Sequence, residues 1–144
     1  MKVKDCMTRN VVVAEPQTLI RDAAQMMQDV DAGILPVARD GHLFGVVTDR
    51  DIVVRGLAKE KDLRGMSSRE IASGELITVR PDQDLSDALH LMAQHQVRRL
   101  PVVDDQNRLV GVVSQADIAL EARDQSVGEM VAEISKPAQG AGHL

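Results

Sequence analysis

The sequence contains one pattern written twice, and this repetition most constrains the fold. Shifting residues 16–37 forward by 65 positions aligns Pro16 with Pro81, Asp22 with Asp87, and Leu35-Pro36-Val37 with Leu100-Pro101-Val102. One residue inserted near Gln106 raises the shift to 66, after which Gly45-Val46-Val47 meets Gly111-Val112-Val113. Such self-similarity predicts a duplicated supersecondary unit whose two half-cores complete one another.

The composition is that of a soluble globular protein. At 144 residues, 44% hydrophobic and 27% charged, the chain fits one ordinary domain or two small units that share a core. No apolar run approaches the roughly 18 to 20 residues that cross a bilayer, and the N-terminus lacks the apolar stretch of a signal peptide. The net charge of -5 disfavours binding to nucleic acid or anionic lipid, because phosphate polyanions need a basic face. We therefore expect a cytoplasmic protein with neither partner.

Cys6 is the only cysteine, so an intrachain disulfide is impossible. This usage fits a reducing compartment. We interpret Cys6 as a small buried hydrophobic residue, with a thiol that cross-links two subunits as the alternative.

Each repeat has the same predicted order of elements. Residues 11–14 and 76–79 are β-prone runs, each followed two residues later by a proline that cannot donate to a sheet ladder. A helix with one apolar stripe comes next, then two β-rich runs across a polar turn, and a second helix begins near Asp49 or Gln115. The apolar stripes consist of Ala23, Met26, Met27 and Val30 in one repeat and of Leu85, Ala88, Leu89 and Met92 in the other. The fold class is α/β (α+β), with β-α-β-β-α repeats.

We place repeat 1 at residues 7–64, repeat 2 at 70–128, and a short C-terminal helix with a flexible tail at 129–144. Residues 57–69 mix charges with Gly65 and two serines, as a solvated connector would. Ser126 and Glu129 have the spacing of a capping box, and apolar residues follow at helical spacing up to Ile134.

The chemistry-bearing pattern is a glycine-led strand that ends in a hydroxyl residue, followed three positions later by an aspartate. Thr48 and Asp51 form it in repeat 1, and Ser114 and Asp117 form it in repeat 2. A hydroxyl at the start of a helix can hold a phosphate, and the aspartate can accept bonds from two ribose hydroxyls. The same spacing also suits a helix cap with nothing bound. Both interpretations stay open at this point.

With these residues the chain resembles a tandem pair of cystathionine-beta-synthase (CBS) domains, a Bateman module. The resemblance covers roughly residues 7–56 and 72–123, and it is strongest to stand-alone bacterial CBS-pair proteins that include hypoxic-response proteins. It implies a three-stranded sheet with two helices per repeat, the repeats packed through their sheets. It also implies two clefts that hold AMP, ADP or ATP in many members, no obligatory cofactor, and a homodimer formed through helices.

The resemblance also implies roles for particular residues. Asp51 and Asp117 would hold ribose, and Thr48 and Ser114 would contact phosphate or ribose. Val12, Ile77 and two strand segments would flank the base, the segments being Ile34-Leu35-Pro36 and Arg99-Leu100-Pro101. Basic residues are distributed unevenly, with Arg50 in repeat 1 and Arg98-Arg99 in repeat 2, so the two clefts should differ in phosphate affinity.

Other candidate sites are weaker. His90 and His95 are five residues apart on a predicted helix, about 140° around it, and do not converge on a metal as i, i+4 ligands would. No catalytic triad, activated cysteine or metal cluster supports an enzyme. Two functions therefore remain: a noncatalytic nucleotide sensor that acts on an unknown effector protein, or an interaction scaffold whose clefts are vestigial.

Overall fold

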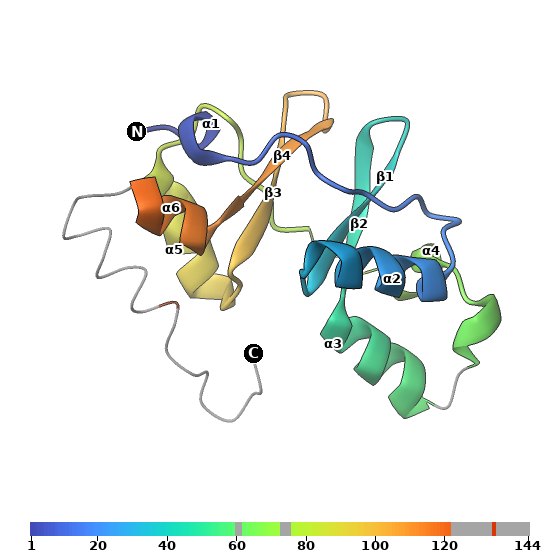
Figure 1. Ribbon diagram of the computed structural model, residues 1–144. Helices are drawn as coiled ribbons and strands as arrows, with labels where there is room; N and C mark the ends of the chain where they lie inside the picture. Colours follow the sequence, from blue (N-terminus) through green and yellow to red (C-terminus); the bar gives the residue numbers. More distant parts are fainter. Residues whose placement is uncertain (60–61, 73–75, 122–133, 135–144) are drawn as a thin grey trace. The chain divides into compact units, whose positions relative to one another are not determined.

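The computed structural model describes residues 1–59, 62–72, 76–121 and 134, and its chain divides into two compact units (Figure 1). Unit 1 contains Met1–Asn10, Ile77–Asp105 and the described residues from Val110 on. Unit 2 contains the described part of Val11–Leu76 together with Gln106–Leu109. The units therefore differ from the two sequence repeats, because the first ten residues of the chain belong with the second repeat.

Both units have the predicted order of helix, hairpin and helix. In unit 2 these elements are α2 (Ile20–Val30), β1 (Ile34–Arg39), β2 (His42–Thr48) and α3 (Asp49–Asp51). The chain then continues through the π-helix η1 (Ile52–Gly56), the 3-10 helices η2 (Leu57–Lys59) and η3 (Leu63–Gly65), and α4 (Ser68–Ile71). The elements of unit 1 are α1 (Val3–Cys6), α5 (Leu85–His95), β3 (Arg99–Val103), β4 (Leu109–Ser114), whose first residue belongs to unit 2, and α6 (Gln115–Glu121).

The strands predicted at 11–14 and 76–79 are reduced to one bridging residue each. Ala14 forms a parallel bridge with Val37, and Val79 forms one with Val102. A longer parallel ladder would need the N–H of Pro36 or of Pro101, and proline has none. The proline of the repeated Leu-Pro-Val motif thus cuts the expected third strand of each sheet to a single residue.

The first hairpin turns through Asp40 and Gly41. Both have positive φ, 52° and 82°, which a type I′ turn requires and which glycine adopts without strain. The tip of the second hairpin packs in unit 2, where Leu43 N donates to Asn107 O at 3.0 Å and Leu109 N donates to Gly41 O at 2.8 Å. These two bonds are related by the 66-residue shift, so equivalent residues of the two repeats pair with each other.

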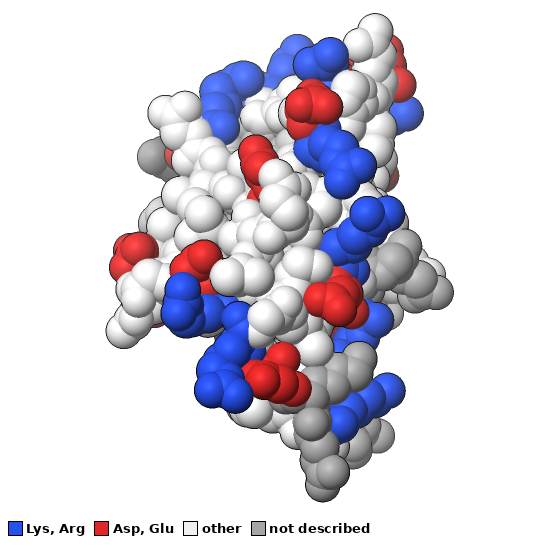
Figure 2. Space-filling model, turned by 90° about the vertical axis from the view of Figure 1, so that its right-hand side faces the viewer, with Lys and Arg blue, Asp and Glu red and all other residues white. Residues whose placement is uncertain are grey.

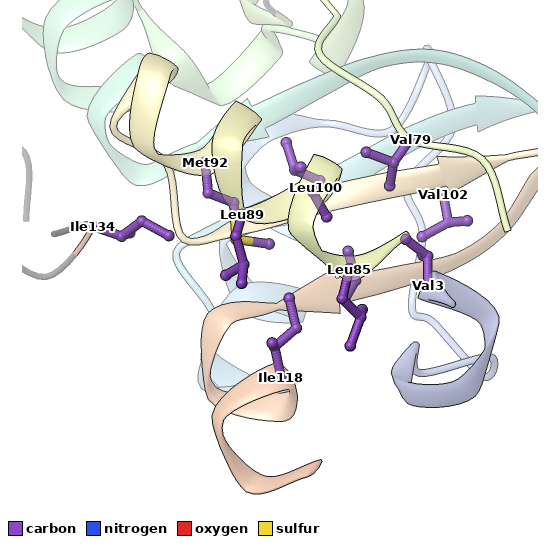
Figure 3. Packing of buried hydrophobic residues seen from close by; sticks show 11 residues of the cluster. Val3, Val79, Leu85, Leu89, Met92, Leu100, Val102, Ile118 and Ile134 are labelled. Atoms are coloured by element: carbon purple, nitrogen blue, oxygen red, sulfur yellow. The ribbon is translucent and has the colours of Figure 1, made fainter. Parts of the chain in front are cut away.

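Each unit has its own aliphatic core. In unit 1 the apolar stripe of α5 is fully buried, and Leu89 and Met92 point toward Leu100 and Ile118 (Figure 3). In unit 2 the stripe of α2 is buried only in part, because Ala23 and Met27 are in the core whereas Val30 is 45% exposed. Val30 is the last residue of α2, and the chain leaves the helix at Asp31 in a left-handed conformation. The predicted stripe is therefore correct except at its C-terminal end.

The connector at 57–69 is not solvated throughout. Met66 is 8% exposed, and Ser68 is fully buried with its hydroxyl donating to Thr18 O at 2.8 Å. Ile71, just beyond, is also fully buried. Charge content alone did not indicate this burial, because the buried residues alternate with exposed ones such as Arg69 and Glu70.

Helices α1 and α4 are 65 residues apart, and each docks on the body of the other repeat. Three backbone bonds recur with that shift: Val3 N to Gln83 O matches Ser68 N to Thr18 O. Likewise Lys4 N to Pro81 O matches Arg69 N to Pro16 O, and Leu85 N to Met1 O matches Ile20 N to Met66 O. Val3 of α1 and Ile71 of α4 are both 0% exposed. Each core is thus completed by the segment that precedes the other repeat.

The surface carries both signs of charge. Figure 2 shows a face on which Lys and Arg side chains are interspersed with Asp and Glu. Within the described ranges, no helix is both long and apolar enough to span a bilayer. The C-terminal helix predicted from Val127 to Ile134 lies outside the described residues, apart from Ile134, which packs in the core of unit 1 (Figure 3).

Docking of the N-terminal segment predicts a stability effect at Gly111. A Cβ there would lie 2.7 Å from Thr8 O and 3.0 Å from Met7 Sδ, so Gly111→Ala must displace the segment. We expect a loss of about 1 to 3 kcal/mol in the free energy of unfolding, measured with urea. Gly65→Ala is the matched control, because nothing lies within 4 Å of its Cβ position, and it should be neutral or slightly stabilising. Equal losses in the two variants would contradict this account of the packing.

Candidate ligand-binding motifs

The motif of repeat 1 is a closed capping box. Thr48 ends β2 and caps α3, its Oγ1 accepting a bond from Asp51 N at 3.0 Å. In return, Asp51 Oδ2 accepts a bond from Thr48 N at 3.1 Å. The hydroxyl and one carboxylate oxygen are therefore committed to their own backbone. The helix cap, which the sequence allowed as the alternative to a ligand site, is therefore present in repeat 1.

Asp49 adds a second carboxylate to this junction. Its Oδ1 accepts a bond from Arg50 N at 2.8 Å, and its own N–H donates to Gly33 O at 2.9 Å. A Cβ on Gly33 would lie only 3.0 Å from Asp49 Oδ2, so the carboxylate lies over the glycine. The absence of a side chain at position 33 leaves room for this arrangement.

The motif of repeat 2 is only half closed. Ser114 ends β4 and is 9% exposed, and its Oγ accepts a bond from Asp117 N at 3.1 Å. Asp117 is half-buried, and no described residue donates a hydrogen bond to its carboxylate. Gln115 N donates to Arg98 O at 2.9 Å, which repeats the Asp49 to Gly33 bond of the other motif. The backbone frame is shared, but of the two motif aspartates only Asp51 has a carboxylate that accepts a bond from a described residue.

The strand segments predicted to flank a base lie beside these motifs. Ile34 pairs with Thr48 across the first hairpin, and Arg98 contacts Gln115 through the backbone bond described above. Leu35 and Leu100 are each 1% exposed and belong to the cores, so only their backbone groups could face a ligand. The rings of Pro36 and Pro101 are buried as well.

The remaining predicted residues differ in exposure. Val12 is 41% exposed and Ile77 is half-buried, each two residues before the bridge at Ala14 or Val79. Arg50 and Arg98 are exposed, whereas Arg99, the first residue of β3, is half-buried. The role of Val12 and Ile77 beside a base stays a prediction.

Cys6 is half-buried and packs against the core of unit 1. By the 65-residue shift it occupies the position of Ile71, which supports its interpretation as a small hydrophobic residue. Burial raises the pKa of its thiol, and the carboxylates of Glu121, Asp5 and Asp117 raise it further. The N-terminal segment therefore lies close enough to the Ser114 motif for Asp117 to influence Cys6.

The histidines lie apart from these motifs on exposed positions. His90 and His95 are exposed on α5, and His42 is exposed at the start of β2. Across residues 1–59, 62–72, 76–121 and 134, no group of three or more His, Cys, Asp or Glu side chains could hold a metal ion.

Sequence reasoning missed two features of the motifs. One is the placement of Asp49 over Gly33, which only the hairpin register brings about. The other is the N-terminal segment beside β4, where Thr8 and Val112 exchange backbone bonds of 2.8 and 3.0 Å. Extending the 65-residue shift back to Met1 and Met66 would have indicated that segment, because Asp5 then meets Glu70.

Comparison with known proteins agrees with this architecture. The family model of the CBS domain matches residues 3–57 and 68–124. A CBS domain-containing protein, YhcV of Bacillus subtilis, is 43% identical over 134 residues, covering 92% of this chain and 94% of the relative. Hypoxic response protein 1 of Mycobacterium tuberculosis is 36% identical over 135 residues, covering 93% of this chain and 94% of the relative. The chain belongs to the CBS domain family, as a tandem pair.

Solved structures support the same fold. The crystal structure of Hypoxic Response Protein I with two coordinated zinc ions matches with a TM-score of 0.78 at 36% identity, covering 85% of this chain and 99% of that one. CBSX2 in complex with AMP matches with a TM-score of 0.73 at 28% identity, covering 83% and 94%. The CBS domain pair of protein MJ0100, in complex with 5′-methylthioadenosine and S-adenosyl-L-methionine, matches with 0.73 at 29%, covering 84% and 94%.

The two motifs should differ in their contribution to stability. Asp51→Ala and Asp117→Ala both remove a favourable charge from the first turn of a helix. Asp51→Ala also removes the hydrogen bond that Thr48 N donates, whereas no described residue donates to the Asp117 carboxylate. We expect the loss in unfolding free energy to be about 1 kcal/mol larger for Asp51→Ala, measured in urea without ligand. A larger stability loss for Asp117→Ala than for Asp51→Ala would contradict the assignment of the closed capping box to repeat 1.

The raised pKa of Cys6 predicts slow alkylation. A raised pKa means that less thiolate is present at a given pH, so iodoacetamide should modify the folded protein at pH 8 more slowly than the same chain in urea. Glu121→Gln should speed the reaction of the folded protein, because Glu121 is the largest charged contributor to the raised pKa. Equal rates in folded and unfolded chains would contradict the half-buried position.

Proposed function

We propose that this chain is a noncatalytic regulatory module that binds adenine nucleotides of the AMP, ADP or ATP type in the clefts that its family resemblance implies. One observation carries the proposal. In each unit a backbone bond, Asp49 N to Gly33 O or Gln115 N to Arg98 O, holds the hydroxyl-and-aspartate motif against the start of the first hairpin strand. The predicted sugar and phosphate contacts therefore lie next to the segment predicted to flank the base.

Each residue has a distinct role in this proposal. The carboxylates of Asp51 and Asp117 accept hydrogen bonds from ribose hydroxyls, and Thr48 and Ser114 contact ribose or phosphate. Arginine binds phosphate through charge-assisted and often bidentate bonds, a role open to Arg50 in repeat 1 and to Arg98 and Arg99 in repeat 2. The AMP-bound CBSX2 structure and the adenosyl ligands of MJ0100 support an adenosine-type ligand.

The regulatory output would be exerted on another protein. Binding would shift the geometry of the repeats and so the state of an effector, with the chain acting as a homodimer through its helices. Exposed apolar side chains are available for such a contact, among them Val53 and Leu57 in unit 2 and Leu120 in unit 1. The single cysteine and acidic net charge support a cytoplasmic location without nucleic-acid or membrane partners.

An interaction scaffold with vestigial clefts is the second candidate. The closed capping box of Thr48 and Asp51 favours it, because both side chains already have partners in their own backbone. A ligand at this motif would have to replace the bond to Asp51 Oδ2 or use the other carboxylate oxygen.

A thermal-shift titration separates the two functions. A ligand that binds only the folded state raises the melting temperature, and the rise grows with ligand concentration. At a ligand concentration of 100 times Kd the folded state gains about 2.7 kcal/mol in stability. We expect AMP, ADP or ATP at millimolar concentration to raise the midpoint, with NAD and S-adenosylmethionine as further adenosine-containing probes. If all five leave the midpoint unchanged, the sensor is excluded and the scaffold remains.

A further inference from the structure

The hairpin end of unit 2 carries three basic side chains in one row. Arg39 and His42 pair across β1 and β2 on either side of the turn, and His42 also forms an antiparallel bridge with Arg108. Residues that pair directly on neighbouring antiparallel strands project from the same face. The side chains of arginine, histidine and arginine therefore lie side by side across three adjacent segments. All three residues are exposed, and all belong to unit 2.

Backbone pairing holds this row in place. The two bonds between the hairpin tips, described above, flank His42 and Arg108 and make them a non-hydrogen-bonded pair, the type in which side chains approach most closely. Asn107 Nδ2 adds a bond to Leu43 O at 3.1 Å. Arg108 Nη1 lies 3.5 Å from the position that a Cβ of Gly41 would take, so its guanidinium lies beside the turn of the first hairpin.

Two members of the row keep their donors available. Among the described residues, none forms an ion pair or a side-chain hydrogen bond with Arg39 or His42. Asp40 in the turn is the nearest carboxylate along the chain, whereas Asp105, close to Arg108 in the sequence, is ion-paired with Arg80. The chain thus retains a basic row although its net charge is -5.

The chemistry of the row suits a phosphoryl group. Neighbouring strands are about 4.8 Å apart, so the two arginines stand about 10 Å apart at the backbone, and their long side chains can reach an anion centred over the histidine. Each guanidinium can bind such an anion through two hydrogen bonds, and the imidazole between them supplies a further N–H. A carboxylate has two oxygens and satisfies one guanidinium, whereas a phosphoryl group has oxygens for both and for the imidazole.

We propose that the row of Arg39, His42 and Arg108 binds a phosphoryl dianion, either as inorganic phosphate or as a small phosphomonoester. The row is separate from the hydroxyl-and-aspartate motif of the same unit. His42 begins β2 and Thr48 ends it, about 20 Å along an extended strand. The inference is therefore independent of the proposed nucleotide function.

NMR of the full chain reports on this site through the Gly41 amide and the His42 imidazole. Inorganic phosphate, added at constant ionic strength because salt screens exposed charges, should shift both signals along a saturable curve. Acetate at the same concentrations should shift them much less. Glycerol 3-phosphate distinguishes the two sources of the anion: tighter binding than phosphate identifies a phosphomonoester, and weaker binding identifies the free ion.

Substitutions in the row should change the phosphate affinity in both directions. Arg39→Gln and Arg108→Gln should each weaken phosphate at least about fivefold, because each removes a charge-assisted pair of bonds. Arg39→Lys keeps the charge but removes the planar fork, and should weaken phosphate about twofold or more. Asp40→Asn should tighten phosphate about twofold, because it removes the nearest carboxylate while Asn-Gly preserves the type I′ turn.

Arg21→Gln is the matched control. It makes the same substitution and the same change in net charge at an exposed position of α2, where Arg21 lies 3.8 Å from Asp22. Phosphate affinity in this variant should equal that of the parent chain. All substituted positions are exposed, so the variants should fold, and circular dichroism with a melting curve checks this for each.

Three results would overturn the inference. One is the absence of a saturable shift with phosphate, and another is an equal response to acetate. The third is a loss in Arg21→Gln as large as that in Arg39→Gln. The proposed function is tested separately, because Arg39 has no role in it: Arg39→Gln should retain the rise in melting temperature with AMP, ADP or ATP. Loss of that rise would overturn the separation of the two sites.

Discussion

Completion of each core by the segment that precedes the other repeat is the packing constraint on which the rest of the structure depends. Val3 and Ile71 are fully buried, and three backbone hydrogen bonds anchor each short helix in equivalent ways. Burial of aliphatic side chains and pairing of backbone groups both stabilise the folded chain. If α1 or α4 were undocked, its apolar side chain would be exposed to water and its backbone groups would lose these hydrogen-bond partners. Neither repeat contains all the residues of a core, because Val3 belongs to the core of unit 1 and Ile71 to the core of unit 2.

The same docking positions the motif of repeat 2. The N-terminal segment runs beside β4, where Thr8 pairs with Val112, two residues before Ser114. Gly111 permits that approach because its missing Cβ leaves space for the carbonyl of Thr8. The residues of β4 that pack against the N-terminal segment thus lie directly before the candidate site. Cys6 belongs to the same segment, and the pKa of its thiol is raised by burial and then by carboxylates that include those of α6.

Duplication provides an internal comparison that a single motif could not. The hydroxyl and aspartate recur with equivalent backbone bonds, but the Asp51 carboxylate accepts a bond from Thr48 N, whereas none of the described residues donates to the Asp117 carboxylate. A Thr/Ser-x-x-Asp pattern is therefore compatible with capping and with ligand binding in the same fold. The deciding quantities are the bonds that each carboxylate makes and the charges beside it, which differ between Asp49 with Gly33 and Gln115 with Arg98.

Periodicity and turn chemistry act within a few residues, so they were enough to predict the duplication, the order of elements, the hairpin turns, most of the core stripes and the family. Three outcomes needed the folded structure: α1 and α4 each pack on the other repeat, Pro36 and Pro101 reduce the first strands to single bridges, and Thr48 N donates to the Asp51 carboxylate whereas no described residue donates to that of Asp117. These outcomes depend on contacts between residues far apart in the chain, whose side chains and backbone groups meet only after folding.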